Sequence, residues 1–108
     1  MSTRTLFVLR MPPENAEHVA TLFAEHDKGD LPHVVGLTRR TLFEFNGLYM
    51  HLVEGTEDSM RRLAANRDRP DFQEINTRLD DYLQRYDPAN WRDLTDSMAR
   101  PFYTWTAE

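Results

Sequence analysis

The sequence contains no cysteine and no long hydrophobic run, and it has fewer basic than acidic residues. Without cysteine, a disulfide, a thiolate nucleophile, a zinc–thiolate site and an iron–sulfur cluster are all excluded. The longest uninterrupted aliphatic and aromatic run is Leu6–Leu9, far short of the roughly 20 residues that a transmembrane helix needs. The 13 basic and 18 acidic residues give a formal charge of −5. We therefore expect a protein that binds neither nucleic acid nor a membrane.

Several common signatures of cofactor and metal sites are also missing. The sequence has no glycine-rich phosphate loop, no Gly-x-Ser-x-Gly turn, no His-Glu-x-x-His motif and no paired histidines at metal-ligand spacing. We therefore expect no metal ion, nucleotide or flavin. No charged and then apolar leader opens the sequence, so we also expect a cytoplasmic protein.

The length and composition favour one globular domain. A chain of 108 residues predicts a single domain over residues 1–108. Hydrophobic residues make up 40% of the chain and aromatic residues 11%. This content is sufficient for a packed core, although the mean hydropathy is −0.69.

Hydrophobic spacing and turn residues divide the chain into six elements. We expect strands over 3–11, 37–45, 48–54 and 98–106, the last an edge or bulged strand because it contains Pro101. We expect a first helix over 14–27, and a second helical stretch from Met60 that Pro70 interrupts and Asp87-Pro88 ends. The order β-α-β-β-α-β predicts an α+β, ferredoxin-like fold, with an antiparallel sheet and helices on one face.

The Asn46-Gly47 pair between two apolar runs predicts a tight hairpin, because both central residues of a type I′ turn need positive φ. A two-residue loop pairs Phe45 with Leu48, and side chains then alternate between the two faces. One face, which needs to be buried, carries Thr41, Phe43, Phe45, Leu48, Met50 and Leu52. The other face mixes polar and apolar groups, namely Arg40, Leu42, Glu44, Tyr49, His51 and Val53.

Two groups of residues are candidates for a catalytic role. The hairpin register makes Arg40 and His51 diagonal neighbours, with Cβ atoms about 7 Å apart. A neutral imidazole that titrates near neutral pH can accept a proton, while a guanidinium can hold an enolate; the alternative is a cross-strand surface pair. His26 occupies a position on the first helix where the spacing predicts an apolar residue, next to Asp27. It belongs either to a pocket or to a helix end stabilised by the dipole.

A family resemblance extends over almost the whole chain. The residues that carry it are Val8–Met11, Ala16–Ala20, Phe23–Asp27, Leu31-Pro32, Gly36, Arg39-Arg40, Leu42-Phe43, Phe45, Leu48–Leu52, Glu54, Phe72–Glu74, Phe102-Tyr103 and Trp105-Thr106. Together these residues resemble the tetracenomycin-type aromatic polyketide cyclase family. The chain departs from the family in its loops, around Lys28–Asp30, Arg67–Asp71 and Asp87–Asp93.

The resemblance implies a function, a partner and an assembly. The function is cofactor-independent, aldol-type ring closure with dehydration of a late aromatic polyketide intermediate, in bacterial antibiotic or pigment biosynthesis. The assembly is a homodimer of ferredoxin-like units, the dimeric α+β barrel. Two alternatives are a cofactor-free polyketide monooxygenase of the same fold and a non-catalytic polyketide-binding chaperone.

Combined with the hairpin register, this function suggests roles for eight residues. We expect His51 to act as the base, Arg40 to hold the enolate or carbonyl, and His26 with Asp27 to form a secondary proton-handling pair. The expected substrate-binding residues are Tyr49, Leu42, Val53 and Phe23.

Overall fold

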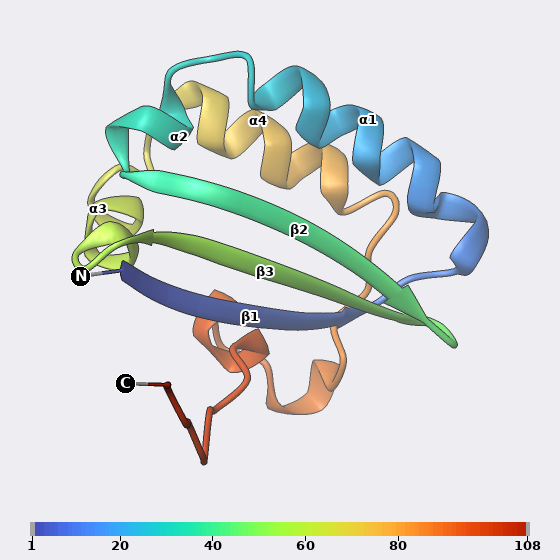
Figure 1. The fold of residues 1–108 in the computed structure, drawn as a ribbon. Coiled ribbons are helices and arrows are strands. Elements are labelled where there is room, and N and C mark those ends of the chain that lie inside the picture. Colours follow the sequence, from blue (N-terminus) through green and yellow to red (C-terminus); the bar gives the residue numbers. More distant parts are fainter. Residues whose placement is uncertain (1, 108) are drawn as a thin grey trace.

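The computed structural model describes residues 2–107 and contains a three-stranded antiparallel sheet covered by helices (Figure 1). The strands are β1 (Ser2–Arg10), β2 (Leu37–Phe45) and β3 (Leu48–Thr56), in the order β1-β3-β2. The helices are α1 (Ala16–His26), α2 (Leu31–Val34), α3 (Ser59–Ala65) and α4 (Pro70–Leu79), with 3-10 turns at Pro13–Asn15, Pro88–Asn90 and Leu94–Ser97. Apart from the last strand, the predicted order of elements is confirmed.

The β2–β3 hairpin has the predicted turn and register. Asn46 and Gly47 have φ values of 48° and 84°, as a type I′ turn requires. Phe45 pairs with Leu48, and Leu42 pairs with His51. The register shifts only near Leu37, at the start of β2. All mixed-face residues of β2 from Arg40 onward therefore lie on one side of the sheet.

The helices α1 and α4 cover the mixed face of the hairpin (Figure 1). Tyr49 and Val53 are buried there, and Tyr49 belongs to a core cluster with Met11, Val19, Phe23, Ile75 and Leu79. The opposite face stays open within the chain, and Phe43 and Phe45 are 47% and 61% exposed. The structure thus confirms helices on one face and shows that the mixed face is the inner one.

The prediction of a strand over residues 98–106 is wrong. The chain touches β1 through a single bridge between Met98 and Phe7, and the Ala99 N–H donates to the Leu6 carbonyl over 2.7 Å. It then leaves the sheet, and Phe102, Tyr103 and Trp105 are exposed. The pattern of residues suits a strand, but Pro101 has no N–H to donate, and no strand within residues 2–107 pairs with this segment.

The second long helix also ends earlier than predicted, at Leu79 rather than near Asp87. Tyr82 and Leu83 still pack against the core, but in a turn closed by hydrogen bonds to the Leu79 carbonyl. Two acidic residues, Asp80 and Asp81, follow Leu79, and negative charge is unfavourable at a helix C-terminus. The turn brings Gln84 to the edge of β1, where it exchanges two 2.8 Å backbone hydrogen bonds with Arg10.

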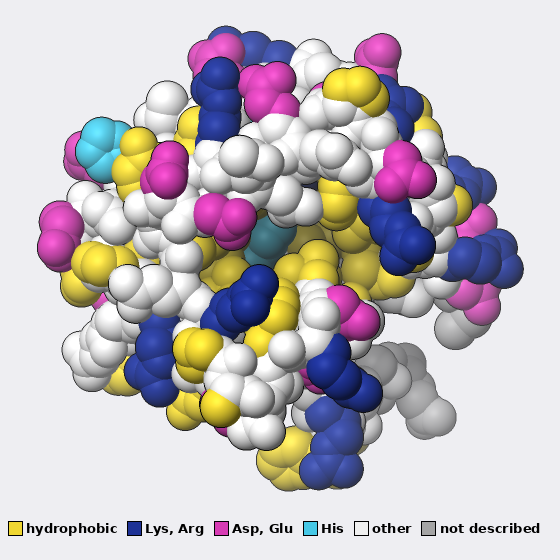
Figure 2. Space-filling model, turned by 180° about the vertical axis from the view of Figure 1, so that it is seen from behind, with side chains coloured by type: hydrophobic (Ala, Val, Ile, Leu, Met, Phe, Trp, Pro, Cys, Tyr) yellow, Lys and Arg dark blue, Asp and Glu magenta, His cyan; other side chains and the backbone are white. Residues whose placement is uncertain are grey.

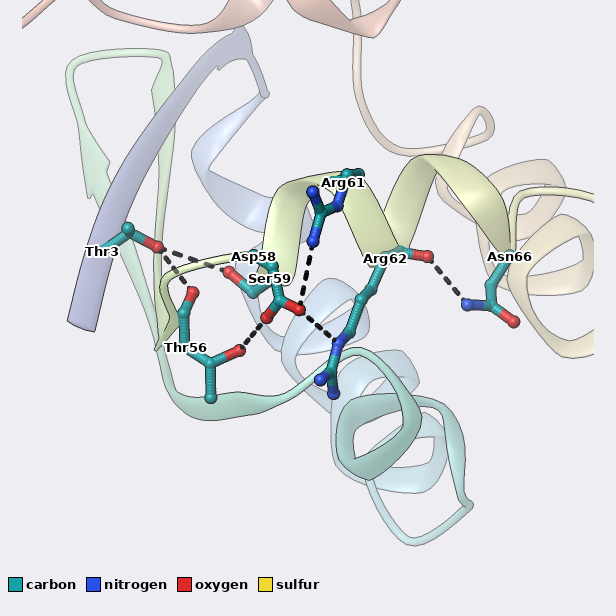
Figure 3. A network of polar contacts seen from close by, with 7 residues as sticks. All are labelled: Thr3, Thr56, Asp58, Ser59, Arg61, Arg62 and Asn66. Atoms are coloured by element: carbon teal, nitrogen blue, oxygen red, sulfur yellow. Dashed lines mark hydrogen bonds and ion pairs between the residues drawn. The ribbon is translucent and has the colours of Figure 1, made fainter. Parts of the chain in front are cut away.

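A polar network joins the end of β3 to α3 (Figure 3). Asp58 accepts hydrogen bonds from the Thr56 hydroxyl (2.9 Å) and from Arg62 Nε (2.9 Å). The Thr3 hydroxyl donates to the Thr56 carbonyl, which links β1 to the same junction. Gly36 approaches this junction so closely that a Cβ there would lie 2.5 Å from the Thr56 Oγ1. The network therefore fixes where α3 starts.

Alanine substitutions at two glycines should separate backbone strain from close packing. Gly36 and Gly47 both have positive φ, but a Cβ at Gly47 would meet nothing within 4 Å. Gly47→Ala should lower the free energy of unfolding by about 1–2 kcal/mol, the cost of a left-handed backbone. Gly36→Ala should cost about 1–3 kcal/mol more, because the methyl group also overpacks the junction. Urea denaturation measures both, and equal losses would contradict the close approach at Gly36.

Candidate functional site

A cavity of about 770 Å³ lies between the inner face of the sheet, α4, α3 and the segment over residues 84–98. Its lining is mostly aliphatic and aromatic, and polar groups occur at a few points. Figure 2 shows a hollow with hydrophobic side chains and a histidine in its depth and charged side chains around it. Its volume lies in the range of small-molecule sites, which is about 300–1,000 Å³.

Arg40, on β2, is the most firmly held polar group of the cavity. Its Nε and Nη2 donate to the two carboxylate oxygens of Asp27, over 3.0 and 2.8 Å. Its Nη1 lies 2.9 Å from the Nε2 of His51, and its guanidinium lies 4.5 Å from the centre of the Phe23 ring. The side chain is 14% exposed. Asp27 therefore fixes one edge of the guanidinium, and the other edge points to His51.

His51, on β3, is held neutral by its surroundings. Burial, and then the positive charge of Arg40, lower the pKa of its imidazole from 6.5 to about 3. The rings of Phe7, Phe23 and Tyr49 lie with their centres within 5.1–6.1 Å of the imidazole. Since Arg40 can only donate, Nε2 accepts this hydrogen bond and Nδ1 carries the proton. The expectation that His51 titrates near neutral pH is therefore wrong for the free protein.

His26 lines the cavity from the last turn of α1, with its ring edge-on to Phe23. Burial, and then the charge of Arg40, lower its pKa. No hydrogen bond joins His26 to Asp27 within residues 2–107; Asp27 is bound to Arg40 instead. The structure thus assembles Asp27, Arg40 and His51 into one hydrogen-bonded row, with His26 beside it.

Three of the four predicted substrate-binding residues line the cavity, namely Phe23, Tyr49 and Val53. Burial raises the pKa of the Tyr49 hydroxyl well above its usual value, so this hydroxyl stays protonated and can donate. Leu42 is not among the lining residues and packs against the core cluster.

The segment over residues 84–98 supplies cavity residues that the sequence did not indicate. Arg85, Trp91, Asp93, Leu94 and Thr95 all line the cavity. The sequence predicted the end of a helix and a connecting loop there, and a loop has no periodicity that points a side chain inward. The large apolar residues Trp91 and Leu94, in a mostly polar loop, were the available signals.

The described residues offer an orienting and polarising site. Arg40 presents a fixed cationic donor, His51 a neutral acceptor and Tyr49 a hydroxyl, all within an apolar enclosure. Such a site can bind a flat, mostly apolar molecule and stabilise negative charge on one of its oxygens. Among residues 2–107, no group of three or more His, Asp or Glu side chains is arranged to hold a metal ion. Within the same range, no helix has the length and apolar character to span a membrane.

Comparison with known proteins gives consistent results. Residues 3–106 match the family described as polyketide synthesis cyclase. The chain is 52% identical over 107 residues to tetracenomycin F2 cyclase of Streptomyces glaucescens, covering 99% of this chain and 97% of that protein. It is 40% identical over 100 residues to the polyketide synthase CurG of Streptomyces cyaneus, covering 93% and 94%.

Solved structures agree with the sequence comparisons. The structure of tetracenomycin F2 cyclase from Streptomyces glaucescens, described as a type-II polyketide cyclase, superposes with a TM-score of 0.91 over 98% of this chain and 99% of that one. SnoaB, a cofactor-independent oxygenase from Streptomyces nogalater, superposes with a TM-score of 0.57 at 21% identity, over 77% and 84%. The likeness to SnoaB shows the fold alone.

The lowered pKa of His51 predicts how stability depends on pH. Below about pH 6.5 the unfolded chain binds a proton at this imidazole that the native chain does not bind, so acid favours unfolding. The free energy of unfolding should therefore fall between pH 6.5 and 5, and less steeply in His51→Gln than in the parent chain. Urea denaturation at the two pH values measures this change. If the free energy of unfolding fell by the same amount in the parent chain and in His51→Gln, His51 would titrate normally.

Proposed function

Since this chain belongs to the polyketide synthesis cyclase family, we propose that it closes a ring in a late aromatic polyketide intermediate by intramolecular aldol condensation and loss of water. The reaction needs no metal ion, nucleotide or flavin, and it takes place in the bacterial cytoplasm. The observation that carries this proposal is the hydrogen-bonded row of Asp27, Arg40 and His51 in the wall of an apolar cavity of about 770 Å³.

The reaction starts with an exchange of hydrogen bonds at Arg40. In the free protein, Arg40 Nη1 occupies the lone pair of His51 Nε2. A substrate carbonyl oxygen that accepts from Nη1 frees this lone pair. His51 can then take a proton from the methylene group next to that carbonyl, and the resulting enolate oxygen stays hydrogen-bonded to Arg40.

Bond formation and dehydration complete the ring. The enolate carbon attacks a second carbonyl of the same molecule, which forms the carbon–carbon bond and an alkoxide. The proton on His51 passes to that alkoxide and gives a hydroxyl group. This hydroxyl then leaves as hydroxide and combines with a proton lost from the adjacent ring carbon, so that one water molecule is released and a carbon–carbon double bond forms in the ring. Aromatisation makes this last step favourable, so the protein acts mainly by holding the two carbons together.

The low pKa of His51 is compatible with this role. An isolated imidazolium is unfavourable at this buried position and beside Arg40, and these two causes lower the pKa of His51 to about 3. When His51 takes its proton from the substrate, an anionic enolate appears at Arg40 and offsets the repulsion between the two cations. Asp27 keeps the guanidinium in place throughout, and His26 is available as a second proton-handling group.

Two alternatives predict different measurements. An oxygenase would consume dioxygen during turnover, whereas ring closure would not. If the chain were a non-catalytic binding protein, replacing Arg40 or His51 would weaken substrate binding. It would not change the rate at which the bound substrate closes its ring. The 52% identity to a cyclase favours ring closure over the oxygenase.

The open face of the sheet supports a homodimer. Phe43 and Phe45 are exposed there, and Phe102, Tyr103 and Trp105 are 88%, 78% and 72% exposed in the extended C-terminal segment. Monomeric proteins rarely leave so many large aromatic side chains in water. We propose that two copies of the chain bury these residues against each other.

Substitutions in the hydrogen-bonded row should lower the rate of ring closure by graded amounts. Arg40→Ala and His51→Ala should each reduce it about 10²–10³-fold, the effect of one electrostatic or acid–base group. Arg40→Lys should retain part of the rate that Arg40→Ala loses, because lysine keeps the positive charge but lacks the planar guanidinium. Steady-state kinetics on an aromatic polyketide substrate measure these rates.

Arg39→Ala is the matched control, because its side chain is 73% exposed and pairs with Glu54 rather than with the cavity. It should retain close to the parent rate. Parent-like rates in Arg40→Ala and His51→Ala would move the catalytic site elsewhere in the cavity.

Replacing the exposed aromatic residues of the sheet should separate the two copies. The parent chain should sediment as a dimer at micromolar concentration, and the double variant Phe43→Glu/Phe45→Glu as a monomer, because burying two carboxylates is unfavourable. Val34→Glu, at an exposed apolar position on α2, should leave the dimer intact. A parent chain that sediments only as a monomer would rule out this assembly.

A further inference from the structure

The segment over residues 84–98 is fixed to β1 at two places and bows away between them. At one end, Gln84 pairs with Arg10, whose Nε also donates to the Tyr86 carbonyl over 3.1 Å. At the other end, Met98 bridges to Phe7, and the Ala99 N–H donates to Leu6. The residues between these anchors form a wall of the cavity that does not belong to the sheet or to the helices.

Arg85 and Trp91 face each other on this wall. The guanidinium of Arg85 lies 4.9 Å from the centre of the Trp91 ring, and both side chains line the cavity. Within residues 2–107, Arg85 forms no ion pair with a carboxylate. A cationic donor beside an aromatic plane is suited to a flat ring that carries a negative group.

The other charged lining residues are engaged or less well placed. Arg40 is paired with Asp27, and Arg61 with Asp58 at 3.5 Å. Asp93 accepts hydrogen bonds from the backbone and hydroxyl of Thr95, so its Oδ1 is taken up by its own turn. Arg67 also lines the cavity, but within residues 2–107 no aromatic ring lies beside its guanidinium. Asp80 lines the cavity as well, and its carboxylate cannot attract a negative group.

The sheet register places Arg85 away from the end of the cavity that contains Arg40 and His51. His51 is level with Phe7 on β1, and Gln84, the residue before Arg85, is level with Arg10. Three residues along a strand correspond to about 10 Å. The cavity therefore has a cationic donor at Arg40 and a second one further along the sheet.

We infer that Arg85 and Trp91 form a second binding subsite, which holds an aromatic ring bearing a carboxylate at the end of the substrate remote from Arg40. This inference rests on the proposed function, because it assumes that the reacting carbonyl binds at Arg40. It narrows the substrate class to anionic, elongated aromatic polyketides. Trp91 stacks on the ring, and Arg85 binds the carboxylate.

Two matched probes test the subsite without any turnover. Anthraquinone-2-carboxylate and anthraquinone-2-carboxamide have the same shape and differ in charge, and isothermal titration calorimetry gives the affinity of each. The parent chain should prefer the carboxylate. Arg85→Gln should weaken binding of the carboxylate about tenfold, the effect of one hydrogen bond to a charged group, and should barely change binding of the carboxamide. Arg85→Lys should keep most of the preference.

Three further variants test whether Trp91 contributes stacking and whether the preference for the carboxylate belongs to Arg85 alone. Trp91→Leu should weaken both probes by a similar factor, about three- to tenfold, because stacking does not depend on the carboxylate. Arg67→Gln, on the lining, and Arg78→Gln, exposed on α4 and paired with Glu74, should keep the parent preference.

Three results would overturn the subsite: no binding of the carboxylate by the parent chain, equal affinity for the two probes, or an unchanged preference in Arg85→Gln. Failure of the proposed function would show separately, as a parent chain that binds the probes but closes no ring.

Discussion

The two-residue turn at Asn46-Gly47 decides which side chains of β2 and β3 share a face of the sheet. Side chains alternate along a strand, so a slip of one residue would carry Arg40 to the face opposite His51. In the observed register, Arg40 and His51 lie under the helices, while Phe43 points to the open face. The cavity and the proposed dimer interface therefore both depend on one turn, whose backbone favours asparagine and glycine.

The ion pair between Arg40 and Asp27 reduces the free-energy cost of placing a cation in an apolar cavity. A lone guanidinium in such a cavity would be costly, because it would lose its hydration. Asp27 balances it from the outer side, where its carboxylate remains 35% exposed, so the pair as a whole is not fully desolvated. The inner edge of the guanidinium stays directed at the cavity. The site thus contains an oriented donor before any substrate arrives, which is the condition for effective electrostatic stabilisation.

The features that were predictable from sequence have local causes. Turn residues specify the hairpin, and hairpin geometry brings Arg40 to His51. The contact between Asp27 and Arg40 joins the end of α1 to β2, and no periodicity encodes it. The low pKa of His51 arises from side chains of three different elements. The region after Leu79 was predicted least well, because it is shaped by the edge of β1 rather than by its own pattern.

The anchoring of the segment over residues 84–98 has an evolutionary consequence. Its ends are held chiefly by backbone hydrogen bonds, at Gln84 and Ala99, which form with almost any side chain. Substitutions, insertions and deletions between the anchors would reshape one wall of the cavity and leave the sheet, the helices and the row at Arg40 in place. Members of the family can thus diverge in the molecules they accept while keeping the same chemistry, and the stretch from Arg85 to Ser97 is where such divergence should be sought.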